Sequence, residues 1–421
     1  MIKKASIPTI RFKGFTETWE QRKLKEVALI HARIGWQNLR KSEFLESGDY
    51  YLITGTDFDN GRVNFKSCRY VEKWRYLQDK KIQIKNENVL ITKAGTIGKV
   101  AFIEGLDKPA TLNSGVYNIE NVSKFFDSKF LFYFLNSSIF TEYINKKITG
   151  SIIKNLNQNI IENFPINYPN GDEQEKLGNL FYSLDNLISF HQRKYLKLEQ
   201  IKKSLLKKML PNDYKNTPYI RFRGFSESWK QRKLKEVALI HARIGWQNLR
   251  KSEFLESGDY YLITGTDFDN GRVNFKSCRY VEKWRYLQDK KIQIKNENVL
   301  ITKAGTIGKV AFIEGLDKPA TLNSGVYNIE NVSKFFDSKF LFYFLNSSIF
   351  TEYTNKKITG SIIKNLNQNI IENFPINYPN GDEQEKLGKF FFQLDNLITL
   401  HQHKCEKLKK IKKSLLEKML V

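Results

Sequence analysis

The most regular pattern of hydrophobic and polar positions begins near residue 172 and continues without a proline to Pro211. Seam positions follow one another at alternating steps of four and three residues, the spacing of a coiled-coil helix. They are Leu177, Phe181, Leu184, Ile188, His191, Tyr195, Leu198, Lys202, Leu205 and Met209. The same spacing returns at Leu387, Phe391, Leu394, Ile398, His401, Cys405, Leu408, Lys412, Leu415 and Met419. Neither helix can bury its seam alone, so we expect the two to pack together as an antiparallel pair.

The start of the first helix carries a capping pattern. Asp172 precedes the periodic segment and Glu175 follows three residues later, which predicts Asp172 as the N-cap of a capping box. At 1.5 Å per residue, a helix from Glu173 to Leu210 would be about 57 Å long.

A mixed α/β pattern precedes this helix. Segments rich in aromatic and β-branched residues predict strands at residues 49–54, 88–92, 98–103 and 115–119. Asp59-Asn60-Gly61 lies between apolar runs and predicts a hairpin turn. It also resembles part of a calcium loop, but the spacing and the final glutamate of such a loop are missing. Asp127 precedes an aromatic-rich segment, 128–147, that predicts a helix packed on the sheet.

The whole arrangement is written twice. Residues 21–178 recur as residues 231–388, and among 158 aligned positions only Ile144, replaced by Thr354, differs. We therefore expect an α/β fold in which two mixed α/β domains, 1–171 and 211–381, are separated by two long antiparallel coiled-coil helices, 172–210 and 382–421. Two near-identical copies can be related by a pseudo-two-fold axis.

Charge then narrows the choice of partner. Lysine and arginine number 69 against 45 aspartates and glutamates, which gives a net charge of +24. This excess favours a polyanionic partner, nucleic acid first and an anionic membrane surface second. The start of the chain has no apolar signal segment, and no apolar run reaches the length of a membrane span. With three widely spaced cysteines and no disulfide framework, we expect a cytoplasmic protein.

Motifs for catalysis are missing from the sequence. It contains no GxxxxGK[ST] loop, no GxGxxG fingerprint, no HExxH and no nucleophile elbow. The cysteines and histidines lack the spacing of a zinc site. We expect no catalytic residue, no cofactor and no metal ion in this chain.

Three loops carry residue types suited to DNA. The segment 93–99, KAGTIGK, offers lysines and a threonine to phosphates, and its glycines permit close approach. The segment 31–41 contains Arg and Gln, which can bond base edges, and the segment 149–155 adds a further polar and basic set. The alternatives are a glycine-rich hairpin with solvated lysines and a basic surface loop held by Trp36. The candidate DNA-binding residues are Arg33, Gln37, Lys93, Thr96, Lys99, Ser151 and Lys154, with Arg243, Gln247, Lys303, Thr306, Lys309, Ser361 and Lys364.

The order of motifs resembles a known family. RFxGF with a following Trp, then KAGTIGK, then GS with NLN, then DEQEKL at the start of a long helix that ends in KKML, occurs twice. This order resembles the specificity (S) subunit of type I restriction–modification systems. The resemblance implies that the domains are target-recognition domains and that the helices are spacers that dock two methyltransferase (M) subunits. It further implies that the M subunits use S-adenosylmethionine to methylate adenine N6, and that restriction (R) subunits use ATP and Mg.

Two other functions remain open on the sequence alone. One is the DNA-recognition subunit of a type II-like methyltransferase or nuclease assembly, and the other is a basic coiled-coil scaffold on an anionic membrane. The M-subunit motif NPP[FY] is missing from this chain, which favours a subunit that does not itself methylate.

The near-identity of the two domains predicts the symmetry of the DNA site that the protein recognises. We expect Ile144 and Thr354 to lie on a helix away from the DNA-binding loops, so that both domains present the same surface. Identical readers related by a two-fold axis read the same bases on opposite strands. The sequence therefore predicts a bipartite palindrome with one methylatable adenine in each half and half-site centres about 10 bp apart.

Overall fold

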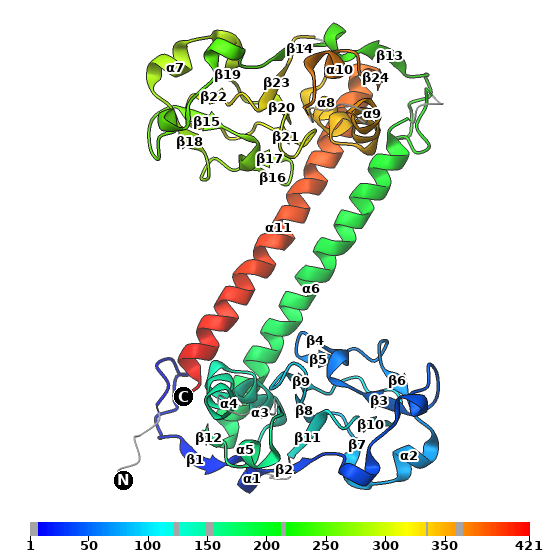
Figure 1. Ribbon diagram of the computed structural model, residues 1–421, viewed down its shortest axis with the longest axis vertical. Coiled ribbons are helices and arrows are strands. Elements are labelled where there is room, and N and C mark those ends of the chain that lie inside the picture. The colour runs from blue at the N-terminus through cyan, green and yellow to red at the C-terminus, as the bar shows by residue number, and fades with distance from the viewer. Residues whose placement is uncertain (1–6, 122–125, 149–154, 212–215, 334–335, 359–364) are drawn as a thin grey trace. The chain divides into compact units, whose positions relative to one another are not determined.

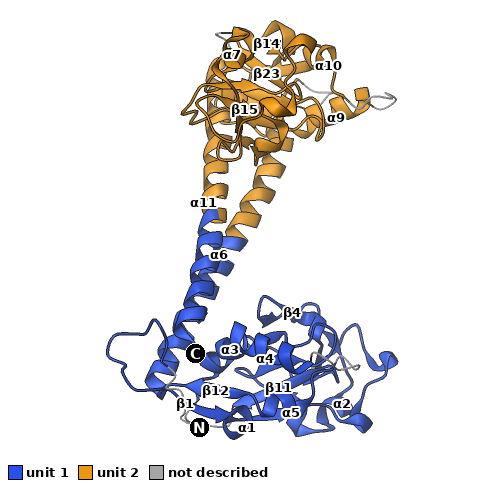
Figure 2. Cartoon of the chain, turned by 60° about the vertical axis from the view of Figure 1, so that its left-hand side comes forward, with its two compact units in different colours: residues 1–192, 403–421 blue, residues 193–402 orange. Residues whose placement is uncertain are grey.

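The computed structural model describes residues 7–121, 126–148, 155–211, 216–333, 336–358 and 365–421 (Figure 1). It divides into two compact units, unit 1 with residues 1–192 and 403–421, and unit 2 with residues 193–402 (Figure 2). Each unit contains one α/β domain, the beginning of the long helix that follows it and the end of the other long helix.

The elements of unit 1 are short strands and helices followed by a long helix. The strands are β1 Glu20–Lys23, β2 Ala28–His31, β3 Tyr51–Ile53, β4 Phe58–Asp59, β5 Arg62–Val63, β6 Arg69–Tyr70, β7 Gln83–Ile84, β8 Val89–Thr92, β9 Val100–Phe102, β10 Ala110–Leu112, β11 Val116–Asn121 and β12 Pro165–Tyr168. The helices are α1 Leu24–Val27, α2 Lys73–Leu77, α3 Ser128–Leu135, α4 Ser138–Ile148, α5 Gln158–Glu162 and α6 Gly171–Met209.

Unit 2 repeats these elements in the same order, except that a 3-10 turn, Leu234–Glu236, takes the place of α1. Its strands are β13 Lys230–Lys233, β14 Ala238–His241, β15 Tyr261–Ile263, β16 Phe268–Asp269, β17 Arg272–Val273, β18 Arg279–Tyr280, β19 Gln293–Ile294, β20 Val299–Thr302, β21 Val310–Phe312, β22 Ala320–Leu322, β23 Val326–Asn331 and β24 Pro375–Tyr378. Its helices are α7 Lys283–Leu287, α8 Ser338–Leu345, α9 Ser348–Ile358, α10 Gln368–Glu372 and α11 Gly381–Met419.

The described strands of each domain form three sheets. In unit 1 a six-stranded sheet has the order β2-β11-β8-β9-β5-β4, a four-stranded sheet the order β6-β3-β10-β7, and β1 pairs with β12. Asn60 and Gly61 have φ values of 47° and 77° and connect β4 to β5, so the predicted hairpin turn is confirmed. The predicted mixed α/β architecture, present twice, is confirmed as well.

Helix α3 forms the centre of the domain core. Its residues from Phe130 to Leu135 are all buried, which is expected for a helix that is apolar on every side. The carboxylate of Asp127 accepts a hydrogen bond from the backbone N–H of Phe130 at 2.7 Å and caps the helix. The single predicted helix is in fact two, because α3 ends at Leu135 and α4 begins at Ser138.

Helix α6 is capped two residues earlier than the sequence predicts. It begins at Gly171, and the side chain of Asn170 accepts a hydrogen bond from the backbone N–H of Glu173 at 3.0 Å. Asp172 lies in the first turn, where its charge still suits the helix dipole. The prediction of Asp172 as N-cap was therefore wrong, because Asn and Asp cap equally well and stand two residues apart.

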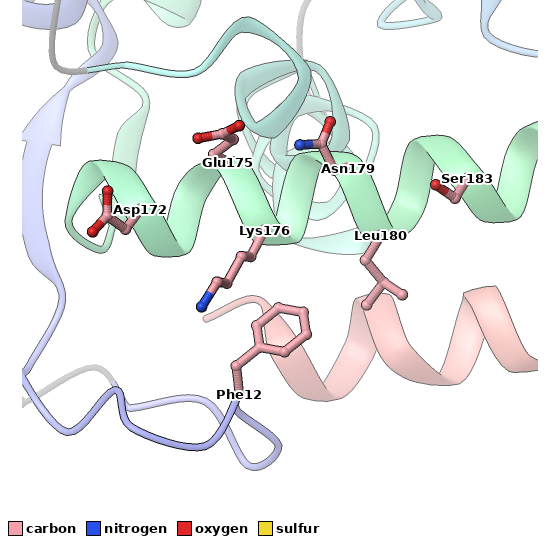
Figure 3. Close-up of a pocket in the computed structure, with 7 residues that line it drawn as sticks. All are labelled: Phe12, Asp172, Glu175, Lys176, Asn179, Leu180 and Ser183. Atoms are coloured by element: carbon pink, nitrogen blue, oxygen red, sulfur yellow. The ribbon is translucent and has the colours of Figure 1, made fainter.

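The N-terminal segment of each domain is hydrogen-bonded to the start of the long helix that follows the domain. In unit 1, Arg11 makes two hydrogen bonds of 2.7 Å to the carboxylate of Glu173, which is buried. The backbone N–H of Ile10 also donates to the carbonyl of Lys418 at the end of α11. Figure 3 shows Phe12 below Lys176 and Leu180, in a groove of about 610 Å³ between this segment and α6. The RFxGF motif thus has a structural role.

The two long helices pack antiparallel inside each unit. In unit 1, Lys412 of α11 donates to Asp185 of α6 at 2.6 Å, and the thiol of Cys405 lies 3.9 Å from the carbonyl oxygen of Ile188. Residue numbers rise along one helix as they fall along the other, so the antiparallel prediction is confirmed. The predicted seam positions are buried or half-buried in both helices.

A polar junction joins each domain to both helices. In unit 1 the hydroxyl of Tyr133, on α3, donates to Asp185 at 2.8 Å, and the same carboxylate accepts from Lys412. In unit 2 the hydroxyl of Tyr343 donates to Asp395 at 2.6 Å, and Lys202 lies 2.5 Å from that carboxylate. Each unit therefore repeats the contacts of the other with the roles of the two helices exchanged.

Candidate nucleic-acid interface

Two of the predicted DNA-binding loops leave the six-stranded sheet at the same edge. Strands β2 and β8 both pair antiparallel with β11, so their carboxyl ends lie together beside the start of β11. Residues 32–43 follow β2, residues 93–99 follow β8, and residues 113–115 lead into β11. We call these three segments the loop edge. In unit 2 they are residues 242–253, 303–309 and 323–325.

The chain that follows the third predicted loop lies beside the loop edge. Ser151 and Lys154, with Ser361 and Lys364, lie outside the described residues. The residues that follow are fixed to the loop edge, because the backbone N–H of Leu156 donates to the carbonyl of Lys93 at 2.8 Å. The hydroxyl of Tyr117 in turn donates to the carbonyl of Leu156 at 2.9 Å.

The KAGTIGK segment is a tight loop rather than an open strand connection. The hydroxyl of Thr92 donates to the carbonyl of Thr96, and the backbone N–H of Gly98 donates to the carbonyl of Thr92 at 2.9 Å. Gly95 and Gly98 have φ values of 73° and 79°, a backbone region that favours glycine. The loop therefore holds a defined shape while exposing Thr96.

The two lysines of this loop lie in different surroundings. The Lys93 ammonium lies 5.4 Å from the centre of the Tyr117 ring, and Lys303 lies 5.7 Å from that of Tyr327. The Lys99 ammonium donates to the carbonyl of Phe58 instead, and Lys309 does the same to Phe268. Lys93 and Thr96 thus belong to the loop edge, whereas Lys99 points toward the β4–β5 hairpin.

Ile144 lies directly behind this loop. It is buried, and its Cδ1 lies 3.3 Å from the position that a Cβ atom on Gly98 would occupy. In unit 2 the hydroxyl oxygen of Thr354 lies 3.8 Å from the corresponding position on Gly308 and donates to the carbonyl of Thr351. The expectation that this position lies away from the loops was wrong. The side chain is nevertheless hidden, so both units still present the same exposed residues.

Arg33 and Gln37 are not on the surface. Their exposed fractions are 2% and 1%, and those of Arg243 and Gln247 are 3% and 2%. The Arg33 guanidinium donates to the carbonyl of Leu112, to the carbonyl of Gln37 at 3.1 Å and to the side chain of Gln78 at 3.1 Å. The structure therefore corrects the prediction that these four side chains read bases, because their donors are taken up inside the domain.

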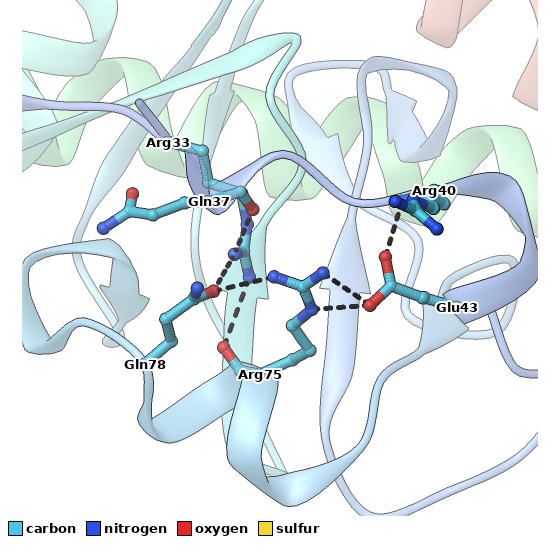
Figure 4. A network of polar contacts seen from close by, with 6 residues as sticks. All are labelled: Arg33, Gln37, Arg40, Glu43, Arg75 and Gln78. Atoms are coloured by element: carbon cyan, nitrogen blue, oxygen red, sulfur yellow. Dashed lines mark hydrogen bonds and ion pairs between the residues drawn. The ribbon is translucent and has the colours of Figure 1, made fainter. Parts of the chain in front are cut away.

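The buried network connects the loop after β2 to helix α2 (Figure 4). Gln37 donates to Asp79 at 2.9 Å, just beyond α2. Glu43 accepts from the backbone N–H of Arg40 and from the Arg75 guanidinium, both at 2.7 Å. These two interactions lower the pKa of Glu43 below its usual value, the Arg40 N–H most. Burial lowers the pKa of Arg33 to about 10, which leaves it cationic at neutral pH.

A charged groove borders the domain and the long helices inside each unit. In unit 1 it has a volume of about 900 Å³ and is lined by Arg62 and Lys99 of the domain and by Lys409, Lys412 and Lys413 of α11, among others. In unit 2 a groove of about 580 Å³ is lined by three cations and by four acids, so it carries no excess of positive charge. These residues are Lys202, Arg272, Lys309, Glu199, Asp269, Glu314 and Asp395. Sequence reasoning missed the contribution of the helices, because Lys412 was assigned only to the seam.

Other site types find no support in the described part of the chain. No cluster of three or more His, Cys, Asp or Glu side chains suited to a metal ion occurs among its residues. The same part of the chain contains no helix that is both long and apolar enough to cross a bilayer.

A mixed α/β domain with lysines in the loops at one sheet edge, present twice and followed each time by a long helix, is typical of a DNA-recognition protein with two repeated domains. Residues 16–200 and 226–410 match the model of the type I restriction modification DNA specificity domain. The chain therefore belongs to this family, as a non-catalytic DNA-recognition subunit of a type I restriction–modification system.

Individual relatives agree along the whole chain. The specificity subunit of type I restriction enzyme MjaVIII from Methanocaldococcus jannaschii is 25% identical over 419 residues, which cover 96% of each chain. The MjaIX specificity subunit of the same organism is 22% identical over 424 residues, covering 96% of this chain and 92% of that one. The crystal structure of the type I S subunit from M. genitalium shares the fold, with a TM-score of 0.68, 16% identity and 99% coverage of both chains.

Proposed function

We propose that this subunit directs its complex to a bipartite DNA site whose two halves are reverse complements. The observation that carries the proposal is the equality of the two loop edges, whose residues and hydrogen bonds repeat from unit 1 to unit 2. The two near-identical domains make the same contacts to the long helices, with the roles of the two helices exchanged. Two such domains related by a two-fold axis bind the same bases on opposite strands. Each half-site then contains one adenine for methylation, and the half-site centres lie about 10 bp apart.

The proposed DNA contacts are the exposed and half-buried residues of the loop edge, not the buried ones. Lys93 and Thr96, with Lys303 and Thr306, contact phosphates next to the bases that are read. Lys99 and Lys309 contribute positive charge from the grooves, together with Lys409 and Lys413 of α11 in unit 1. Ser151, Lys154, Ser361 and Lys364 remain proposed contacts of the third loop.

Methylation sequencing tests the symmetry directly. Cells that express this chain with its M partner would be analysed by long-read sequencing of methylated adenines. We expect one motif, with a specific half-site, a non-specific gap and the reverse complement of the first half. A methylated motif whose halves are not reverse complements would contradict the equal-reader proposal while leaving the family assignment unchanged.

We further propose that two M subunits dock on the long helices, one on each unit. Beside the seam, unit 1 exposes Leu187, Phe190 and Ile411, and unit 2 exposes the equivalent Leu397, Leu400 and Ile201. An apolar row on a paired helix suits an amphipathic segment of a partner. The M subunits would supply S-adenosylmethionine for adenine methylation, and R subunits would supply ATP- and Mg-dependent cleavage.

A double substitution tests the docking surface. Leu187→Glu with Leu397→Glu should abolish co-purification with M, because each charge would be buried in the interface, while the thermal unfolding temperature stays near that of the wild type. The matched control is Gln200→Glu with Lys410→Glu, on the outer faces of the helices, which should bind M normally. Normal M binding by the Leu187 and Leu397 variant would place docking elsewhere.

A further inference from the structure

The two segments joined by the buried Arg33 network expose large apolar side chains. Ile34 and Trp36, on the loop after β2, are 54% and 68% exposed. Trp74 and Leu77, on helix α2, are 58% and 56% exposed. Unit 2 repeats these values to within a percent at Ile244, Trp246, Trp284 and Leu287. By contrast Trp19 and Trp229 are buried in the domain cores. Exposed tryptophans gathered on adjoining segments mark an interaction surface.

Hydrogen bonds and a cation–ring contact fix the backbone and side chains next to the tryptophans. Trp36 lies between Gly35 and Gln37 in a short helical turn, and the Gln37 side chain accepts from the backbone N–H of Ile34 at 3.1 Å while it donates to Asp79. On the other segment, the Arg75 guanidinium lies 4.3 Å from the Trp74 ring centre and is bonded to Glu43. A surface fixed before binding loses little conformational entropy when a partner arrives.

The charge around these side chains is positive. Lys41 and Lys73 are exposed on these two segments, and Lys80 and Lys81 are exposed on the short turn that follows α2; none of the ion pairs found among the described residues involves these four lysines. Two of the neighbouring acids have partners, since Glu43 accepts from Arg75 and Asp79 accepts from Gln37 and from the backbone N–H of Lys81. Glu72, exposed just before α2, is the acid that offsets part of the positive charge. An apolar surface surrounded by cations suits a partner that offers both flat apolar faces and phosphates.

The surface is also continuous with the loop edge. Residues 32–43 belong to the loop edge, and the Arg33 guanidinium donates to Thr111 at 3.1 Å and to the carbonyl of Leu112, immediately before residues 113–115. Trp36 is therefore part of the interface proposed for DNA, and Trp74 is attached to it through the buried network.

We propose that Trp36 and Trp74, with Trp246 and Trp284, contact DNA bases or sugars and hold the half-site in a distorted form. This inference rests on the proposed function. Tryptophan stacks on bases without needing a particular sequence, and apolar side chains hold base steps apart when they enter a groove. Enzymes that modify a base must take it out of the stack, so a DNA-recognition subunit that stabilises an opened step assists the M subunit.

The salt dependence of DNA binding distinguishes contacts made by the tryptophans from contacts made by lysines to phosphates. The probe is a fluorescein-labelled duplex carrying the methylated motif, titrated with the full chain alone and with M. We expect Trp36→Ala with Trp246→Ala, and separately Trp74→Ala with Trp284→Ala, to weaken binding about tenfold without changing the slope of log K against log salt. Lys93→Ala with Lys303→Ala should instead reduce the slope by about 0.9 for each phosphate that is no longer neutralised. Phe in place of Trp36 and Trp246 should retain most of the affinity.

Tryptophan fluorescence supplies a second readout with an unlabelled duplex. Four of the six tryptophans are exposed, so wild-type emission should fall on DNA binding, and each double Ala variant should lose part of that change. The matched control is Leu29→Ala with Leu239→Ala, exposed apolar residues on β2 and β14 that should leave affinity and quenching unchanged.

The outcomes distinguish this inference from the proposed function. Wild-type protein that does not bind the duplex, alone or with M, would overturn the proposed function itself. Wild-type binding together with normal affinity and quenching in both tryptophan variants would overturn the inference alone. Tryptophan variants that bind DNA normally but no longer associate with M would assign the surface to a protein partner, which also overturns it.

Discussion

The recognition domains and the long helices have diverged to very different degrees between the two copies. From residue 21 to residue 178 one position in 158 differs, whereas from residue 179 to residue 210 twelve of 32 positions differ from residues 389–420. Among the seam positions only Tyr195 changes, to Cys405. The other differences lie outside the seam and include exposed pairs such as Leu196 and Glu406.

This contrast separates two kinds of structural requirement. A helix pair requires an apolar repeat and a few fixed polar contacts, so its outer positions can vary freely. Asp185, Lys202, Asp395 and Lys412, which form the polar junctions, are the same in both copies. A reading surface requires specific side chains across its whole extent. The long helices therefore need to keep only their pairing contacts, whereas the domains need to keep the side chains of a whole surface.

Breaking the seam should have the largest effect. Leu198→Asp together with Leu408→Asp places a carboxylate at a half-buried position of each helix, at a cost of about 3 kcal/mol or more per site. We expect poor folding or loss of M binding, measured by circular dichroism, thermal unfolding and co-purification. Leu196→Asp with Glu406→Asp is the matched control, since both positions are exposed. A fully folded seam variant that still assembles with M would contradict the assignment of Leu198 and Leu408 to the seam.

Reversing one charge of a polar junction should have an intermediate effect. Lys202→Asp places a second carboxylate beside Asp395, so we expect unfolding stability to fall by about 2–3 kcal/mol, less than for a fully buried pair because both side chains retain some exposure. Lys412→Asp should cost a similar amount in unit 1, because the junctions are equivalent. Urea denaturation measures both, and adding Asp395→Lys to Lys202→Asp should restore part of the stability. Lys203→Asp, at an exposed neighbour, should change little.

The fold was accessible from the sequence because each main feature had a local signal. Alternating and apolar segments predicted β3, β8, β9 and β11, the Asn60-Gly61 pair predicted the hairpin, and the seam spacing predicted the long helices. The sequence was less informative where two neighbouring residues could perform the same role. Asn170 rather than Asp172 caps α6, because both residue types perform this role and only the folded chain shows which one is in place.

The site was predicted in part. The sequence indicated the loops that meet at the loop edge, but not which of their side chains face outward. Arg and Gln can bond bases and can equally fill a buried network, and residue type alone does not separate the two. The alternative of a loop held by Trp36 was wrong as well, because Trp36 is exposed and the buried Arg33 and Gln37 hold the loop instead.

Removing the single difference between residues 21–178 and residues 231–388 should have the smallest effect. Thr354→Ile gives unit 2 the side chain that unit 1 already accommodates in otherwise identical surroundings, with its Cδ1 against the KAGTIGK loop. The added apolar burial, set against removal of the hydrogen bond to Thr351, should raise unfolding stability by about 1 kcal/mol. Ile144→Thr should lower it by a similar amount, and urea denaturation of both variants provides the measurement. Because position 354 is buried, DNA affinity should change less than twofold; a larger change would mean that support of the loop from behind alters the reading surface, and that the two readers are unequal in the wild type.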